Sequence, residues 1–549
     1  MKAPNLATST WLVTRFLTST FLALGCSSAL AQLTDGGIHA PPTTGTYGYN
    51  TFRPGTAGFP ALGGFYADPV FGLPVRRLTN VVGATNCDDI YAHHWANADA
   101  TYAFNNVMVS GFCQGPRIIS TTTGAVVYSN QPAGLAFGDL YWDANDPDRY
   151  YYFAGSSLMR RNLAAQTSTT MKTFPAALQS VGQSLNIQDR TGRYLTVRYG
   201  GTNKVWDSQT DTIYSGSVTP LDPGGWTSIT PDGKYLVDAS AQYYSYPIDH
   251  VNKTVGPGTM FWSLCGDHGA LVSASNGKSY LVTFNCNNDP AIFRVDLTLN
   301  QAGRTAVQQA ADNTKLIPLT WNDAGHFSAV SKGSLSDWVF MSTESVIDSF
   351  DSSTANWTAY RQEILAVNVV TLQIKRLAHH RSRSITVNYQ TMPRVSTSWD
   401  GSLVMWASNF DSSSPTGYAD LYAIPSPLGA SSYYTVTPCR LYDSRVPGLP
   451  LLPGEVRVVS TYGTACGVGY GGRALALNVT VTGATAAGNL RVYPAYSPVP
   501  NVSVVNYAAG QTRAGNVVIG LSPQGDLAIR ASQASGTVHV ILDVVGYFQ

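Results

Sequence analysis

Charged residues are scarce in this 549-residue chain. Asp, Glu, Lys and Arg make up only 12% of it, about half the usual quarter of a soluble domain. Basic residues number 34 and acidic residues 33, so the net charge is +1. Nucleic-acid-binding proteins carry a surplus of Lys and Arg on one face, and the charge balance excludes that class.

Several familiar catalytic motifs are also missing. The chain has no Gly-x-Ser-x-Gly, no P-loop and no His-Glu-x-x-His. These absences disfavour a propeller-capped serine peptidase or esterase and the common nucleotide and zinc enzymes. No Cys-x-x-Cys occurs, which disfavours a cysteine metal site, and no later segment has the ~18 apolar residues of a membrane span.

Small, apolar and aromatic residues are abundant instead. Hydrophobic residues make up 44% of the chain, enough to bury a large core and to exclude disorder. There are 51 Gly, 30 Pro and 31 Tyr. This composition predicts an all-β, extracellular protein.

The N-terminus predicts export. Lys2 and Arg15 precede a short apolar stretch at 16–24, and Ala29-Leu30-Ala31 forms a small-x-small cleavage site. Residues 1–31 are therefore predicted to be a secretory signal peptide. The alternative is a lipoprotein acylated at Cys26, although Ala23 stands where such a signal prefers Leu.

The remaining six cysteines fall into three neighbouring pairs. An even number of cysteines in an oxidising compartment favours disulfides. The proposed pairs are Cys87–Cys113, Cys265–Cys286 and Cys439–Cys466. The fourteen other pairings of six cysteines stay open.

Composition divides the mature chain into four parts. Residues 32–70 are rich in Gly, Pro and Thr and form a lead-in, and residues 71–425 repeat one strand–turn theme. A linker follows at 426–432. Residues 433–549 hold several short alternating strands, which predict a β-sandwich domain.

The repeat predicts a seven-bladed β-propeller. One turn anchor per unit recurs 41 to 64 residues apart, the range expected for propeller blades with insertions. The anchors are Asp99, Asp148, Gly192, Gly233, Gly277, Asp337 and Gly401. The seventh unit lacks an outer strand, so strand 74–79 is predicted to complete it and remove an exposed edge.

Turns such as Ser398-Trp399-Asp400-Gly401 resemble those of secreted bacterial WD-like and Tol-type propellers. Two longer stretches, 377–383 and 393–401, resemble secreted propellers of environmental bacteria, which are similar to the oligogalacturonate lyase propellers. The C-terminal Pro438-Cys439-Arg440-Leu441-Tyr442-Asp443-Ser444-Arg445 is similar to a module found at the ends of exported bacterial proteins. The resemblance implies a propeller fold, and it is weak for activity because one fold hosts many functions.

One residue per unit stands near the start of each innermost strand, and these residues predict a ring at one propeller face. They are His94, Tyr141, Ser184, Trp226, His268, His326 and Arg394. A structural role is open, since such a histidine often hydrogen-bonds between blades. Ligand contact, catalysis and metal binding are the alternatives.

The catalytic hypothesis is a polysaccharide lyase that removes the proton α to a uronate carboxylate. Histidine supplies a base near neutral pH, either His268 or His326. Arg394 supplies a cation against the carboxylate. The predicted substrate-binding residues are His94, Tyr141, Trp226, Arg381, Arg383 and Gln390.

The lyase resemblance also implies a divalent metal held by three histidines and one glutamine. Gln390 matches that glutamine, but Pro393 and Arg394 follow where the family has histidine, so Arg394 would replace the charge of the metal. A cluster of His94, His326 and His379 is the alternative site for Mn²⁺ or Zn²⁺. The expected partner is an extracellular polysaccharide or a cell-surface glycan. The competing function is a non-catalytic adhesion protein that binds glycan or protein.

Overall fold

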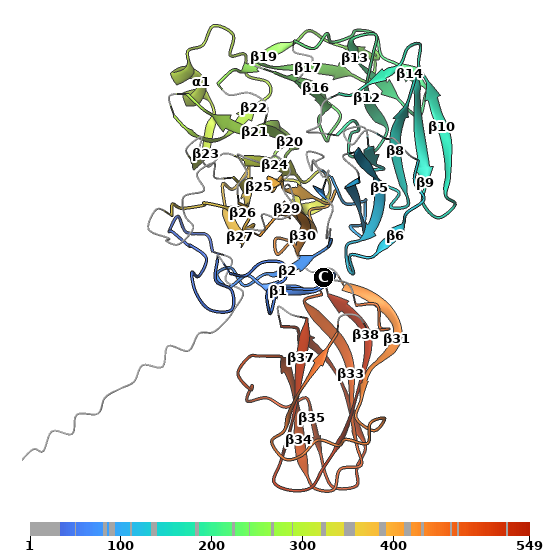
Figure 1. Ribbon diagram of the computed structural model, residues 1–549, viewed down its shortest axis with the longest axis vertical. Helices are drawn as coiled ribbons and strands as arrows, with labels where there is room; N and C mark the ends of the chain where they lie inside the picture. Colours follow the sequence, from blue (N-terminus) through green and yellow to red (C-terminus); the bar gives the residue numbers. More distant parts are fainter. Residues whose placement is uncertain are drawn as a thin grey trace, which may run out of the picture.

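Antiparallel β-sheets dominate the computed structural model of the chain (Figure 1). The structure describes residues 33–49, 51–80, 85–86, 94–109, 112–132, 135, 140–181, 186–221, 225–240, 242–264, 268–287, 289–319, 325–344, 357–383, 391–410, 419–429, 433–461, 464–468, 472–522 and 525–548. Within these ranges the helical elements are α1 (Ala306–Asp312) and one 3-10 turn (Gly333–Leu335). The all-β prediction is confirmed.

Seven sheets follow one another between residues 65 and 425. The first holds β3 (Thr85–Asn86), β4 (Tyr102–Val109), β5 (Phe112–Ser120) and β6 (Val126–Tyr128), and the second holds β7 (Leu140–Trp142), β8 (Arg149–Ala154), β9 (Ser157–Asn162) and β10 (Thr167–Thr173). The third holds β11 (Leu178–Gln179), β12 (Tyr194–Tyr199), β13 (Thr202–Asp207) and β14 (Thr212–Ile213), and the fourth holds β15 (Trp226–Ile229), β16 (Tyr235–Ala239), β17 (Tyr243–Asp249), β18 (Thr254–Val255) and β19 (Thr259–Trp262).

The next three sheets follow the same plan. The fifth holds β20 (Gly269–Ser273), β21 (Ser279–Asn285), β22 (Ala291–Asp296) and β23 (Thr314–Pro318), and the sixth holds β24 (Gly325–Ala329), β25 (Trp338–Thr343), β26 (Glu363–Asn368) and β27 (Ile374–His379). The seventh holds β28 (Ser396–Thr397), β29 (Leu403–Ser408), β30 (Asp420–Pro425), β2 (Pro74–Arg77) and β1 (Phe65–Ala67). In Figure 1 the seven sheets succeed one another around the upper part of the molecule.

The repeated turn has a local cause in the sequence. In the fourth sheet, Asp232 Oδ1 accepts hydrogen bonds from Thr230 Oγ1 and from the Lys234 backbone N–H, while Gly233 takes a φ of 74°. The seventh sheet repeats this arrangement around Asp400 and Gly401. Glycine adopts this left-handed conformation without the steric cost that other residues meet.

Apolar clusters lie between consecutive sheets. One joins the fourth and fifth sheets, for example through Val237 and Leu281, and another joins the fifth and sixth through Val282 and Met341. A further cluster combines side chains of the first, second and seventh sheets, including Phe104, Trp142 and Leu421. The last sheet therefore packs against the first.

The N-terminal strand completes the seventh sheet, as predicted for residues 74–79. Arg76 and Arg77 of β2 pair with Ala423 and Tyr422 of β30. β1 then adds a fifth strand outside β2. Part of the segment predicted as a lead-in is thus built into the fold, because its aromatic side chains Phe52 and Tyr66 pack in the core of the sixth and seventh sheets.

Two further sheets face each other at the C-terminal end of the described chain (Figure 1). One holds β31 (Tyr433–Asp443), β38 (His539–Phe548), β33 (Ala474–Thr482) and β36 (Arg513–Gly520), and the other holds β32 (Val456–Ser460), β37 (Asp526–Gln533), β34 (Gly488–Pro494) and β35 (Val505–Tyr507). Alternate residues of β33 are buried, as expected for a strand with one face on a core. A single apolar cluster, made only of residues from this region, fills the space between the two sheets.

One predicted disulfide lies wholly within the described residues. Cys439 and Cys466 are joined by an S–S bond of 2.06 Å. Cys286 is also disulfide-bonded, but its predicted partner Cys265 lies outside the described residues. Cys87 lies outside them too, and nothing is described of the Cys113 side chain.

A buried ion pair joins β2 to β30 in the seventh sheet, and its contribution to stability can be tested. The Asp420 carboxylate, fully buried, accepts from Arg77 Nε at 2.8 Å and from Thr79 Oγ1 at 2.9 Å. We expect Asp420→Ala to lower the free energy of unfolding by about 3–5 kcal/mol, because Arg77 is left as an uncompensated buried charge.

Chemical denaturation followed by tryptophan fluorescence measures this change. The matched control is Asp289→Ala, which removes a half-exposed partner of Lys315 and should cost less than about 1 kcal/mol. Equal losses for the two variants would contradict the role assigned to Asp420.

Candidate functional site

Three predicted catalytic residues meet around a carboxylate that the sequence analysis did not single out. His326 on β24 places Nδ1 2.9 Å from Glu344 Oε1, at the end of β25. The same oxygen accepts from the Arg394 backbone N–H at 3.0 Å and from Ser342 Oγ at 2.9 Å. We call His268, His326, Glu344 and Arg394 the His–Glu cluster.

His268 completes the cluster from the neighbouring sheet. Its ring centroid lies 4.2 Å from that of His326, and its Nδ1 lies 3.0 Å from the Gly325 carbonyl oxygen. Because that oxygen can only accept, His268 Nδ1 carries the proton of this hydrogen bond. The His–Glu cluster therefore joins the fifth, sixth and seventh sheets.

Burial and neighbouring charges set the protonation states in the cluster. Burial alone would raise the pKa of Glu344, but the charge and hydrogen bond of His326 and the Arg394 N–H outweigh it and hold that pKa at about 2. Burial, followed by the nearby His326, lowers the pKa of His268 to about 3. At neutral pH Glu344 is ionised, so His326 Nδ1 donates to it, while His268 is neutral.

The cluster has the elements of acid–base chemistry. A carboxylate that holds the Nδ1 proton of a histidine fixes its tautomer, so that Nε2 is the basic atom. Arg394 is fully buried beside this pair. His268, with its pKa near 3, is a weak base, and His326 is the histidine that the carboxylate orients.

His94 has a different environment. Its Nδ1 lies 3.0 Å from the Thr397 carbonyl oxygen of the seventh sheet, and its Nε2 lies 2.8 Å from Ser331 Oγ, which follows β24 in the sixth sheet. Its ring stacks on Trp399 at 4.2 Å. Both ring nitrogens are engaged, so the structure places His94 as a connector between sheets.

The predicted residues at the end of β27 and directly after it lie against the N-terminal segment. His379 Nε2 donates to the His39 carbonyl oxygen at 2.7 Å, and Asp68 Oδ2 lies 3.6 Å from its Nδ1. Arg381 Nη1 donates to the Tyr47 carbonyl oxygen at 3.0 Å. Arg383 lies over the Tyr49 ring, 5.3 Å from its centroid. These side chains hold residues 33–71 to the sixth and seventh sheets.

The two predicted aromatic contacts are core residues. Tyr141 packs with Leu195 and Trp206 between the second and third sheets, and Trp226 packs with Leu271 between the fourth and fifth. Both are buried, so the structure does not offer either ring to a sugar. Gln390 and Ser184 lie outside the described residues.

The structure does not bring the predicted metal ligands His94, His326 and His379 together. Each contacts different partners, and nowhere in the described ranges do three or more His, Cys, Asp or Glu side chains form a group that could hold a metal ion. The histidine pattern misled because sequence alone does not show the carbonyl and carboxylate partners that each imidazole meets.

The residues of the predicted ring also do not occupy equivalent positions along their innermost strands. In each sheet a backbone hydrogen bond closes the first turn, donated for example by Thr230, Val330 or Ser398. The distance along the chain from the predicted residue to this donor differs between units. It is four residues for Trp226, His326 and Arg394. It is six residues for His268, three for His94 and two for Tyr141. Turn lengths differ between units, and an alignment on turn residues hides the difference.

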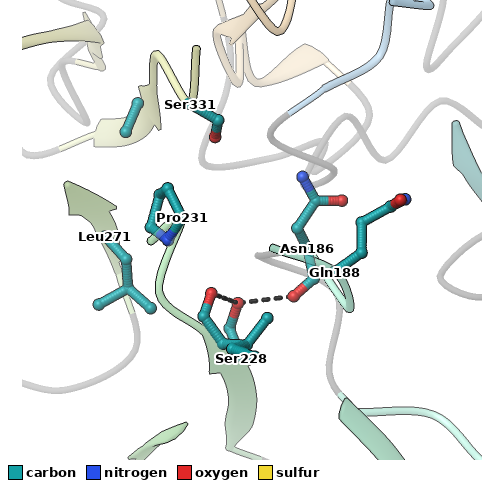
Figure 2. A pocket seen from close by; sticks show the side chains of 8 residues that line it. Asn186, Gln188, Ser228, Pro231, Leu271 and Ser331 are labelled. Atoms are coloured by element: carbon teal, nitrogen blue, oxygen red, sulfur yellow. Dashed lines mark hydrogen bonds between the residues drawn. The ribbon is translucent and has the colours of Figure 1, made fainter. Parts of the chain in front are cut away.

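A pocket lies further along the innermost strands, away from the His–Glu cluster. It is lined by Asn186, Gln188, Ser228, Ile229, Pro231, Leu271, Ala329 and Ser331, from the third to the sixth sheets (Figure 2). No charged side chain is among them. The sequence analysis missed this pocket because its residues form no motif; they share only their place near the end of an inner strand.

Comparison with known proteins adds no relative: no protein-family model matches the chain, and a search of curated proteins finds no match. Within the described part of the chain, no helix combines the length and apolar character needed to cross a membrane. The resemblance to oligogalacturonate lyase propellers stays a prediction.

The pKa of Glu344 generates a pH test. A carboxyl whose pKa is depressed on folding stabilises the protein above its unfolded pKa, and this stabilisation is lost as the pH falls through the folded pKa. For Glu344 the window runs from its ordinary 4.5 down to about 2. We expect Glu344→Gln to cost about 3 kcal/mol at pH 7 and the difference from the wild type to vanish across this window.

Denaturant unfolding at a series of pH values measures the difference. Glu455→Gln is the control, because Glu455, next to β32, is paired with Arg457 and is partly exposed. A deficit in Glu344→Gln that stays constant down to pH 2 would show that the variant acts through packing and not through charge.

Proposed function

We propose that this protein is an extracellular, non-catalytic carbohydrate-binding protein built from a seven-bladed β-propeller and a β-sandwich. The seven sheets would be the blades. Support comes from the apolar clusters between consecutive sheets, including the seventh and the first, and from the N-terminal strand in the seventh sheet. The Cys439–Cys466 disulfide fits an oxidising compartment.

The observation that supports a binding function is that several of the predicted histidines and arginines form hydrogen bonds within the protein. His94, His379 and Arg381 each hydrogen-bond a backbone carbonyl of another segment. Their polar atoms thus serve to join sheets and segments. The pocket on the inner strands, by contrast, has a neutral lining of amides, hydroxyls and apolar groups. A lining without charge favours an uncharged ligand over an ionised one.

Affinity screening tests this function. The purified full chain is passed over immobilised neutral polysaccharides and polyuronates, with immobilised bovine albumin as the control surface. We expect retention on at least one neutral polysaccharide, with the retained polymer recovered uncleaved. Passage through every carbohydrate surface without retention would contradict carbohydrate binding.

A polysaccharide lyase is the second candidate, and the His–Glu cluster favours it. His326, oriented by Glu344, would remove the proton α to a uronate carboxylate, and Arg394 would stabilise the charge that develops on that carboxylate. The C–O bond to the 4-linked sugar then breaks, the departing oxygen takes up a proton in place of the one removed by His326, and a double bond is left in the uronate ring. Unlike hydrolysis, this step consumes no water.

Ultraviolet absorbance of the unsaturated product separates the two candidates. If the lyase is correct, polyuronates yield this absorbance, and His326→Ala lowers the rate by about 10²–10⁴-fold. His94→Ala is the matched control, because His94 is a buried connector outside the cluster, and its rate should change little once folding is confirmed. No absorbance with any polyuronate, with or without Mn²⁺, rejects the lyase and leaves the binding function standing.

A further inference from the structure

The β-sandwich carries a surplus of positive charge. Residues 433–549 hold seven arginines, no lysine and four acidic residues, although the net charge of the whole chain is only +1. All four carboxylates already have partners within the sandwich. The pairs are Asp443 with Arg440 and Arg445, Asp543 with Arg440, Glu455 with Arg457, and Asp526 with the Tyr496 hydroxyl. The remaining arginines therefore have no carboxylate of this region to pair with.

Two of those arginines stand directly opposite each other on neighbouring strands. Arg491 of β34 pairs in register with Arg530 of β37. Their neighbours along the strands, Leu490, Val492 and Ile529, belong to the apolar core between the two sheets. Since side chains alternate between the faces of a strand, both arginines lie on the outer face of this sheet. Both strands belong to the sandwich in the lower part of Figure 1.

Neither guanidinium group has a partner in the part of the chain that the structure describes. Arg491 and Arg530 are partly buried, and the Nε atom of each is buried without a hydrogen bond. Their Nη atoms are accessible and make no hydrogen bond or ion pair with the described residues. Like charges directly opposite each other on two strands destabilise a sheet. The pair therefore lacks a counter-charge, and its Nη groups are open to one from outside.

The residues around the pair on the same face are neutral. On the next row, Asn489 lies between Ser532 and Asn506. On β32, Val456 and Val458 are 47% and 45% exposed. Amides and hydroxyls can hydrogen-bond the hydroxyl groups of a ligand, and exposed valines can contact its carbon faces. The surroundings thus favour a ligand that carries its negative charge among hydroxyl groups.

From these features we infer that Arg491 and Arg530 bind the carboxylate of an acidic polysaccharide, a polymer of uronate residues. A guanidinium group donates two parallel N–H bonds to a carboxylate, and long side chains at opposite strand positions can reach one ligand. A single contact of this kind is weak at a partly exposed site, and a polymer that repeats the carboxylate keeps its concentration there high. The site lies outside the His–Glu cluster and does not depend on the proposed function.

Arg491→Gln and Arg530→Gln test the site. Isothermal titration of the purified full chain with short polygalacturonate fragments at low salt should show binding that weakens at least about tenfold in each variant. Tm should stay equal or rise, because each change removes a repulsion between like charges. Arginines with a purely structural role would instead lower Tm on substitution and leave the affinity of the folded protein unchanged.

Arg513→Gln is the matched control. Arg513 is exposed and lies on β36 in the other sheet of the sandwich, and its loss changes the net charge of the protein by the same amount. Binding should be unchanged in this variant. An equal loss of affinity in Arg513→Gln would show that net charge alone attracts the polymer, and would overturn the site.

Val456→Glu tests the site without removing an arginine. Val456 stands opposite Arg530 on the outer face, so a carboxylate at this position would pair with Arg530 and compete with the ligand. We expect weaker binding in Val456→Glu and unchanged binding in Val456→Gln, its neutral control. This pair of variants keeps the test falsifiable if the arginine variants fail to fold.

The remaining outcomes separate the site, its ligand and the proposed function. Affinity that survives both Arg491→Gln and Val456→Glu overturns the site, and so does a wild type that binds no polygalacturonate at low salt. Binding of dextran sulfate in preference to polygalacturonate overturns the carboxylate as the ligand. Retention on neutral polysaccharides, which tests the proposed function, should be the same in all these variants, so either proposal can fail without the other.

Discussion

Charge that is buried must be paired, and this constraint shapes the junction of the sixth and seventh sheets. Four carboxylates are buried there, and each meets a cation or a histidine: Glu363 with Arg376, Asp420 with Arg77, Asp68 with His379, and Glu344 with His326. An unpaired buried charge costs far more than a pair returns. Each carboxylate and its partner therefore have to be buried at the same time. The sixth sheet, the seventh sheet and the described part of residues 33–80 are thus coupled through these pairs.

Buried charges also occur in the second to fifth sheets, for example Arg198 and Asp238. The interfaces among the second to fifth sheets depend on apolar clusters such as those around Leu195 and Leu281. The junction that takes in the N-terminal segment depends on ion pairs and on imidazoles held by carbonyl oxygens. Polar contacts are directional, so they fix the position of a segment that apolar packing alone would leave free to slide.

Much of the architecture was predictable because it depends on local patterns. The turn at Asp400 and Gly401 predicts a hairpin. The absence of an outer strand after Tyr422 predicts that residues 74–79 pair with the last strand of this unit, which is β30. The site was less predictable. His268, His326 and Arg394 do meet, but the partner that unites them, Glu344, is a lone acidic residue after an apolar strand. Its importance comes from a tertiary contact with Arg394, fifty residues away.

The pairing of β2 with β30 has a consequence for biosynthesis. Arg77 and Asp420 are separated by 343 residues, so the chain must be synthesised beyond residue 420 before the seventh sheet can assemble. Until then β2 and its aromatic neighbours have no place to pack, while the intervening sheets can already form from local hairpins. Contacts of such long sequence separation slow folding and leave exposed strand edges open to aggregation. The N-terminal segment is thus among the first parts synthesised and the last to fold, and a chain truncated before residue 420 would lack the partner for its own beginning.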